Sequence, residues 1–320
     1  MAELTQSRIP VILNPKARSE AARSTAEQVA GFSCQVEIHE TGAPLDAKRI
    51  ARELAEADFP LIVAAGGDGT INEVVSGITA AQQASHGEIQ PTLGVLPFGT
   101  MNVFARELGI PRNDPPAAWA VIQSGLTAEI DLWLANDTPF IQMAGVGLDA
   151  EIIRQTTWKS KKFFGPFSYL LTGLRMVGQA RPKLRIEIPG HDEPLNGSTV
   201  VIGNGCLYGG SLPFFPGASN RDGRLDILLF RELNTWVLLQ LGLAVASNER
   251  CRSRRVVYER AEEFTVTSVG ASEAPFEVDG EYVGQTPISF RKAGRPLRVA
   301  VPADPAPRSL PELAEQHFSS

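Results

Sequence analysis

"AAGGDGTINE", residues 64–73, joins the apolar run "PLIVAA" (60–65) to the helix-like run "INEVVSGI" (71–78). In the second run Ile71, Val74, Val75 and Ile78 follow at i, i+3, i+4 and i+7, which gives one apolar helical face. The glycines between the runs let the backbone approach a ligand closely, and a helix N-terminus offers free N–H groups to an anion. The stretch therefore predicts a strand, a turn and a helix suited to binding phosphate.

Two side-chain features refine this prediction. Thr70 followed by Glu73 matches a capping box, so we expect the helix to begin there. Asp68 would repel a bare phosphate, which favours a magnesium ion or a water network between this carboxylate and a nucleotide. The lysine motif GxxxxGK[ST] is absent from the stretch. The alternative is an ordinary strand-to-helix turn in which Asp68 and Gly69 supply only turn chemistry.

Two more loops favour the ligand site. Short buried strands alternate with helical runs through the first third of the chain, which predicts a parallel sheet. "NPKAR" (14–18) and "PFGTMNVFAREL" (97–108) each follow such a strand. Because parallel strands end at one edge of their sheet, the three loops should converge there. Together they predict a nucleotide cradle whose donors are Asn14, Lys16, Arg18, Thr70, Thr100 and Asn102.

From about residue 130 the pattern changes to short β-rich segments punctuated by Gly, Pro, Asn and Asp, such as "STVVIGN" and "FEVDGEYVG". This pattern is typical of an antiparallel sandwich or barrel. We expect an α/β domain over 1–135, an all-β sandwich over 136–302, and a tail over 303–320 that is a candidate to pack back on the first domain.

Composition narrows the class of protein. The 320 residues carry a formal net charge of −6, which argues against broad nucleic-acid binding. The 3 cysteines and 4 histidines are scattered, so neither a disulfide framework nor a histidine metal site is expected. We see no secretory signal and no apolar stretch long enough to span a bilayer, which predicts a cytoplasmic protein. The sequence does not indicate an oligomeric state.

The motifs resemble those of the diacylglycerol kinase catalytic family, which includes bacterial diacylglycerol kinases and the sphingosine and ceramide kinases. "GGDGTINEVVSGI" and "LPFGTMNVFARELGIP" look like its nucleotide motifs, and "AGVGLDAEI" (144–152) and "FEVDGEYVG" (276–284) like later blocks. NAD kinases share the GGDG loop but not the remaining pattern. The resemblance implies a parallel-sheet domain of the NAD-kinase and diacylglycerol-kinase kind that binds ATP and Mg²⁺, a C-terminal β-sandwich, and a lipid substrate met at the membrane surface.

The resemblance also implies roles for single residues. The lipid hydroxyl would lose its proton to Asp279 or Glu281, with Asp68 as a further catalytic carboxylate. A second Mg²⁺ would be held by the Asp222 carboxylate and by backbone carbonyls of Ser219 and Arg224. By motif match, ATP would contact Asn14, Pro15, Lys16, Ala17, Arg18, Thr41, Gly66, Gly67, Asp68, Gly69, Thr70, Asn72, Glu73, Gly99, Thr100 and Asn102.

The sequence departs from the family pattern at two places. The first loop reads "NPKARSE" where many members have Asn-Pro-x-Ser-Gly, and Val103 stands where several members carry Asp. Asp279-Gly280 and Asp222-Gly223 are also plain hairpin signals. Lys16 or Arg18 would compensate for the missing glycine turn by charge.

Membrane contact and rival functions complete the predictions. "WKSKKFFGPFSYLLTGL" (158–174) and "CRSRRVVYER" (251–260) mix basic with aromatic residues, which suits the inner, anionic face of the cell membrane. The alternative for both is a solvated surface whose aromatic residues pack into the core. "GVGLDA" (145–150) fits a dinucleotide fingerprint but lies in the β-rich part, which argues against a Rossmann oxidoreductase. We expect a diacylglycerol kinase; the alternatives are a ceramide or sphingoid-base kinase and a non-catalytic lipid- or nucleotide-binding protein.

Overall fold

A computed structural model describes residues 8–15, 27–32, 35–147, 182–208, 210 and 212–303. The described residues form two compact units. The first contains the chain up to Leu132 together with residues from Ala293 onward, and the second runs from Trp133 to Lys292.

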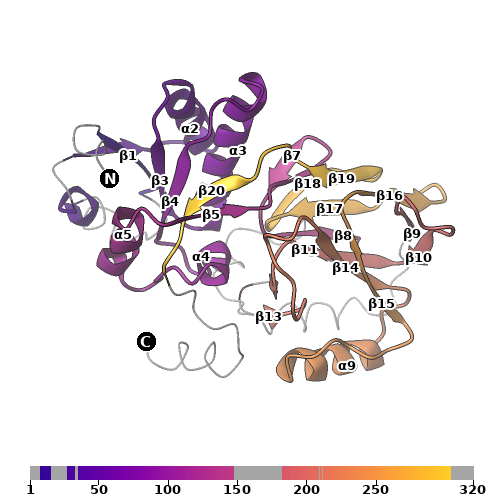
Figure 1. Cartoon of the computed structure of the whole chain (residues 1–320). Helices are drawn as coiled ribbons and strands as arrows, with labels where there is room; N and C mark the ends of the chain where they lie inside the picture. Colours follow the sequence, from indigo (N-terminus) through magenta and orange to yellow (C-terminus); the bar gives the residue numbers. More distant parts are fainter. Residues whose placement is uncertain are drawn as a thin grey trace. The chain divides into compact units, whose positions relative to one another are not determined.

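The first unit is built around one sheet with helices on it (Figure 1). Its elements are β1 (Ile9–Leu13), β2 (Val36–Glu40), α2 (Asp46–Glu56), β3 (Leu61–Gly66), α3 (Asp68–Ala84), β4 (Thr92–Pro97), α4 (Val103–Glu107), α5 (Pro115–Gln123), β5 (Thr127–Ile130) and β20 (Leu297–Ala300).

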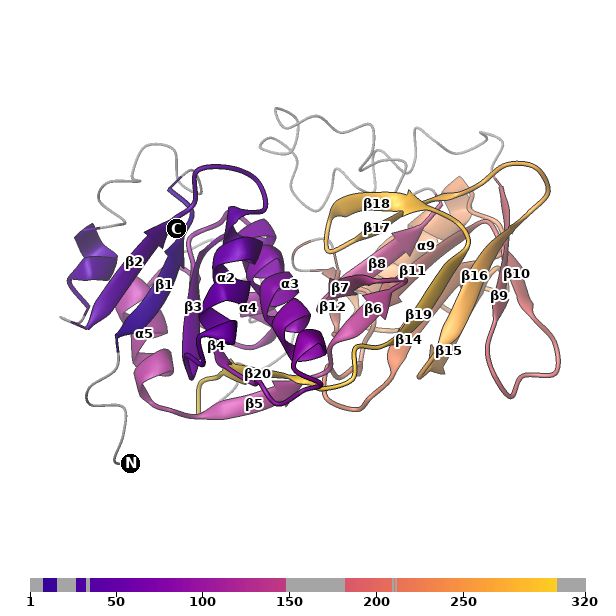
Figure 2. The same cartoon turned by 90° about the horizontal axis from the view of Figure 1, so that it is seen from above.

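The strands of this unit lie in the order β2-β1-β3-β4-β20-β5. All neighbours pair in parallel except β5, which runs antiparallel to β20. Helices α2 and α3 lie together on one face and α5 on the other (Figure 2). The predicted apolar face of α3 is fully buried at Ile71, Val74 and Ile78. The predicted parallel α/β sheet is therefore confirmed.

The course of the chain differs from the expected domain boundaries. The first unit ends at Leu132, three positions before the expected boundary at 135, and the chain returns to it at Ala293. The expectation had placed 293–302 in the sandwich. The physical reason for the difference is β20, whose backbone pairs with β4 on one side and with β5 on the other.

The described residues of the second unit form strands and one helix. Its elements are β6 (Trp133–Ala135), β7 (Thr138–Phe140), β8 (Met143–Val146), β9 (Lys183–Glu187), β10 (Leu195–Gly197), β11 (Thr199–Gly203), β12 (Leu207–Tyr208), β13 (Leu212–Pro213), β14 (Leu225–Phe230), α9 (Thr235–Ala246), β15 (Val256–Ala261), β16 (Phe264–Val269), β17 (Pro275–Val278), β18 (Glu281–Gln285) and β19 (Ile288–Lys292).

Two antiparallel sheets of this unit, β10-β9-β16-β19-β6-β7 and β15-β14-β11-β8-β17-β18, enclose an apolar core. In β14 the side chains of Leu225, Ile227 and Leu229 belong to that core, whereas Leu228 and Phe230 belong to a second cluster with α9. The alternation places α9 on the outer face of the second sheet. The predicted sandwich is confirmed. Among the described residues, no helix has both the length and the apolar character required to cross a bilayer.

Candidate functional site

Helix α3 begins directly at the glycine turn. Asp68 is its first residue, and Gly67 is the N-cap, in an extended conformation with no side-chain cap. The N–H of Ile71 donates to the carbonyl of Gly67 at 3.1 Å, which is the first hydrogen bond of the helix. The N–H groups of the three residues before Ile71 therefore have no acceptor within the helix. This end of α3 is where the dipole and the N–H groups favour an anion.

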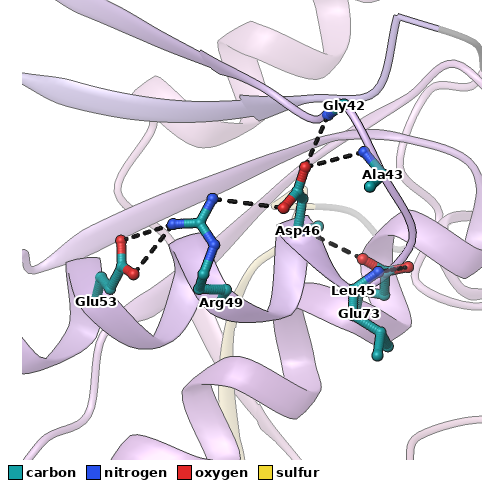
Figure 3. A network of polar contacts seen from close by, with 8 residues as sticks. Gly42, Ala43, Leu45, Asp46, Arg49, Glu53 and Glu73 are labelled. Carbon is teal, nitrogen blue, oxygen red and sulfur yellow. Dashed lines mark hydrogen bonds and ion pairs between the residues drawn. The ribbon is translucent and has the colours of Figure 1, made fainter.

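The predicted capping box is wrong. The helix begins two residues before Thr70, so Thr70 lies inside the first turn and cannot cap it. The Glu73 carboxylate instead accepts the N–H groups of Leu45 at 3.0 Å and Ala47 at 3.1 Å. Figure 3 shows Glu73 beside the start of α2, where Asp46 accepts further backbone N–H groups. Glu73 thus ties α3 to the N-terminus of α2, and its predicted contact with ATP stays a prediction.

Two glycine loops approach each other closely at the ends of β3 and β4. A Cβ atom built on Gly67 would lie 3.2 Å from the Cα of Gly99. The Asn102 side chain shapes the second loop, because its Oδ1 accepts the Gly99 N–H at 3.0 Å and its Nδ2 donates to the Gly99 carbonyl at 2.8 Å. Asn102 is buried, whereas Thr100 is exposed. Only glycine permits this backbone contact, which leaves the loop surface open to a ligand.

The first loop supplies Asn14 to the same sheet edge. The Asn14 backbone N–H donates to Ala65 at 3.0 Å, and its side-chain Nδ2 donates to Oγ1 of Thr70 at 3.1 Å. Thr41 continues the neighbouring strand, since its N–H donates to Leu13 at 2.9 Å. The ends of β1, β2, β3 and β4 thus place Asn14, Thr41, Gly67 and Gly99 at one edge of the sheet. Lys16, Ala17 and Arg18 lie outside the described residues.

Asp68 is a partly buried carboxylate at this edge. Its Oδ1 accepts the Phe104 N–H at 3.4 Å. Burial raises the pKa of Asp68, and backbone N–H groups led by that of Phe104 oppose the shift. The side chains of Arg106 and Arg112 act on the same carboxylate electrostatically. The first unit therefore places the Asp68 carboxyl group at the glycine turn, within electrostatic reach of two cations.

Sequence analysis missed Arg106. The residue is buried in α4, and its Nε and Nη1 atoms have no hydrogen-bond partner among the described residues. Burial, together with the nearby Arg112, lowers the pKa of Arg106 to about 10, while Asp68 opposes that shift. The available signal was an arginine inside the otherwise buried stretch "VFARE", since a buried charge needs a compensating partner.

Asp279 occupies the tip of a hairpin in the second unit. Asp279 and Gly280 both have positive φ, 49° and 83°, and they connect β17 to β18 by the expected two-residue turn. The Asp279 carboxylate accepts three backbone N–H groups, from Ile141 at 3.0 Å, Gln142 at 2.9 Å and Met143 at 2.9 Å. These bonds hold the carboxylate in one orientation. Glu281, two residues on, has an exposed side chain at the start of β18.

A third acid near this turn was not identified by sequence analysis. Glu277 is fully buried in β17, where its carboxylate accepts the Gly280 N–H at 2.8 Å and lies 3.5 Å from the Tyr208 hydroxyl. In "FEVDGE" the alternation of the strand would place Glu277 on the same face as Asp279. Glu277 therefore braces the turn that carries Asp279.

The predicted second magnesium site contains a guanidinium. The Asp222 carboxylate accepts the Arg224 N–H at 3.1 Å through one oxygen, and its other oxygen forms an ion pair with Arg260. Arg260 also lies 3.4 Å from the Asp226 carboxylate. In the described part of the chain, no group of three or more His, Cys, Asp or Glu side chains is placed to hold a metal. Arg260 thus pairs with both carboxylates, and the predicted binding of magnesium by Ser219, Asp222 and Arg224 stays a prediction.

Comparison with known proteins decides the family. Residues 8–135 match the diacylglycerol kinase catalytic domain, and residues 142–301 match the YegS C-terminal NAD kinase beta sandwich-like domain. The chain is 32% identical over 309 residues to a diacylglycerol kinase of Bacillus subtilis, which covers 93% of this chain and 98% of that protein. The chain belongs to the diacylglycerol kinase family. It is therefore a lipid kinase, and the predicted resemblance is confirmed.

Further relatives agree with this membership. A diacylglycerol kinase of Staphylococcus carnosus is 30% identical over 306 residues, covering 93% of this chain and 96% of that protein. A solved diacylglycerol kinase structure from Bacillus anthracis has a TM-score of 0.71 at 21% identity, over 93% of this chain and 97% of that one. This structural similarity supports the two-unit fold.

Proposed function

We propose that the chain transfers the γ-phosphoryl group of ATP to the hydroxyl of diacylglycerol or a closely related lipid. The observation that carries the proposal is the close approach of Gly67 and Gly99 beside the N-terminus of α3, with Asp68 as the first residue of that helix. Such a surface suits a polyphosphate, because backbone N–H groups can face it without side chains in the way. Full-length similarity to diacylglycerol kinases supports the choice of acceptor.

Phosphoryl transfer depends mainly on positioning and on charge stabilisation. We assign the phosphate surface to Gly67, Gly69, Gly99 and Thr100, with Asn14 and Thr70 at its border. The Asp68 carboxylate fits a magnesium ion held through water, and such an ion would neutralise charge on the phosphates when bound. Arg106 supplies a fixed positive charge beside Asp68. The remaining residues matched to ATP, including Lys16, Asn72 and Glu73, stay within this proposal.

A lipid alcohol is a weak nucleophile at neutral pH, so a carboxylate that removes its proton speeds the transfer. We assign this general base to Asp279, because its orientation is fixed by three backbone N–H groups. The Glu281 side chain is exposed at the start of β18, and Glu281 is the alternative base. The enzyme would meet its lipid at the inner face of the cell membrane.

The test is a phosphate-transfer assay with γ-labelled ATP and magnesium. The acceptors are diacylglycerol, monoacylglycerol, ceramide and sphingosine in detergent micelles, and NAD in solution. We expect label in diacylglycerol, and a loss of at least about 100-fold in Asp68→Asn. Asp58→Asn is the matched control, because Asp58 is an exposed turn residue whose positive φ of 64° asparagine tolerates. Label in NAD alone, or equal rates in both variants, would refute the proposal.

A further inference from the structure

Helix α9 carries two opposite apolar faces. Val237, Leu241 and Val245 pack against the outer side of the second sheet. On the other side Trp236, Leu239 and Leu243 remain exposed by 63%, 53% and 73%. They follow at i, i+3 and i+7, so they form one stripe along the helix. Figure 1 shows α9 on the outside of its unit, below β14 and β15.

The composition of the helix makes this stripe unusual. Its sequence "TWVLLQLGLAVA" contains no charged residue, although surface helices ordinarily carry charges on their outer face. Among the described residues, these three side chains are the exposed large hydrophobic groups that share one element. A contiguous apolar surface of this kind marks a contact with another apolar phase.

The segment that follows α9 is basic. Arg231 precedes the helix, and Arg250, Arg252, Arg254 and Arg255 follow it before β15, all exposed. Glu232 and Glu249 are the acids of residues 231–255, so five arginines against two glutamates give a local charge of +3, in a chain whose net charge is −6. Arg255 pairs with Glu232 at 3.2 Å, and Arg250 lies over the Tyr258 ring at 5.4 Å.

We propose that the α9 stripe and the arginines that flank it form a surface that binds an anionic lipid bilayer. An uncharged helix face of Trp and Leu beside arginines combines the apolar insertion and the electrostatic attraction that hold a peripheral protein at a membrane. The inference deepens the proposed function, on which it rests, because it names how the enzyme reaches a substrate that resides in the bilayer. A second copy of the chain would present the same cluster of arginines, so charge repulsion disfavours a dimer through this face.

Vesicle co-sedimentation without ATP tests the surface directly. Wild type should bind vesicles of phosphatidylcholine with phosphatidylglycerol, and it should bind pure phosphatidylcholine weakly. Leu239→Ser/Leu243→Ser should reduce binding roughly tenfold or more, and Arg252→Gln/Arg254→Gln roughly fivefold per arginine removed. The matched controls are Val269→Ser and Arg185→Gln, which alter an exposed apolar and an exposed basic residue elsewhere in the same unit and should bind like wild type.

Tryptophan emission gives a second readout. The difference spectrum between wild type and Trp236→Phe should shift to shorter wavelength when anionic vesicles are added, because Trp236 would leave water. Equal vesicle binding by the leucine variant and wild type would overturn the proposal. The proposal would also fail if the wild type formed a dimer without lipid and Leu239→Ser/Leu243→Ser were monomeric. The stripe would then bind a second copy of the chain.

Activity assays separate this proposal from the proposed function. The leucine variant should phosphorylate diacylglycerol in detergent micelles at the wild-type rate and lose activity on vesicles. Micellar activity with unchanged vesicle binding would refute the surface alone. If the leucine variant lost vesicle binding but the wild type phosphorylated no lipid, the proposed function would be refuted. The proposed membrane surface would still be supported.

Discussion

Asp279 and Met143 are hydrogen-bonded to each other twice. The Met143 N–H donates to Oδ1 of Asp279 at 2.9 Å, and the Asp279 N–H donates to the Met143 carbonyl at 2.8 Å. These two bonds fix the hairpin tip between β17 and β18 to the start of β8. They also hold the Asp279 carboxylate in one orientation.

Asp279→Asn should therefore change both activity and stability. An amide has one oxygen and one NH₂ group, so at least one of the three backbone donors would lose its acceptor, which destabilises the fold by about 1–2 kcal/mol. If Asp279 is the general base, Asp279→Asn should lower kcat by about 10²–10⁴-fold. The assay temperature should lie below the melting midpoints of both wild type and variant. Glu281→Gln should keep most of its rate, because Glu281 is not the proposed base. The reverse pattern of rates would identify Glu281 as the base.

Gly99→Ala should weaken ATP binding at least tenfold in a calorimetric titration. The new methyl group would meet the backbone of Gly67 and the Oδ1 of Asn102, so the two loops must separate. Gly242→Ala is the matched control, because a Cβ there meets nothing within 4 Å. In a helix interior that change should stabilise the protein by about 0.5–1 kcal/mol. Unchanged ATP affinity in Gly99→Ala would contradict the proposed phosphate surface.

Glu73→Ala should lower the free energy of unfolding by about 1–3 kcal/mol in a urea titration. The substitution leaves the N–H groups of Leu45 and Ala47 without their acceptor at the start of α2. Glu53→Ala removes another glutamate from this network, one that pairs with Arg49 on the helix surface (Figure 3). An exposed pair of this kind contributes about 0.3–0.5 kcal/mol. Equal effects of the two substitutions would show that Glu73 does not stabilise the junction.

The pH dependence of stability should change in Asp226→Asn. Burial raises the pKa of Asp226 above 3.8, and Arg260 opposes the shift. The folded state then holds the proton more tightly than the unfolded state, so this group lowers the free energy of unfolding as pH rises from 3.8 through its folded-state pKa. We expect the difference in melting midpoint, Asp226→Asn minus wild type, to rise with pH across this interval. Above the folded-state pKa of Asp226 the difference should stay constant. Asp137→Asn, an exposed control, should give a flat difference.

Magnesium should stabilise Arg260→Gln more than it stabilises the wild type. Without the guanidinium, the carboxylates of Asp222 and Asp226 would repel each other, and a divalent cation could replace the lost charge. Millimolar magnesium should therefore raise the melting midpoint of Arg260→Gln in the absence of ATP. Arg291→Gln, which removes another exposed ion pair of the same unit, should show no such gain. A larger magnesium effect in wild type would restore the predicted metal site at Asp222.

The correct predictions come from short-range patterns. The strand, glycine turn and helix around Asp68 follow from the apolar spacing and glycines of one continuous stretch. The Asp279 hairpin follows from a dipeptide that permits two positive φ values. Each depends only on residues close in sequence, so a single sequence contains enough information.

Most features that the sequence did not predict depend on pairing between distant residues. Nothing within "PLRVAV" distinguishes a sandwich strand from β20, because its place depends on the free edges of β4 and β5. Arg260 lies 38 positions from Asp222, so their ion pair leaves no local pattern. Thr70 and Glu73 match a capping box in spacing, yet the helix had already begun at Asp68. The membrane segment expected at 158–174 lies outside the described residues and stays a prediction.

The position of β20 also sets an order of events during synthesis. The strand that fills the gap between β4 and β5 is made only after the sandwich, so a nascent chain released at residue 292 would carry two unsatisfied strand edges. Folding of the first unit therefore finishes last, although its first strands leave the ribosome earliest. Premature termination near the end of the message should yield an aggregation-prone product rather than a working half-enzyme.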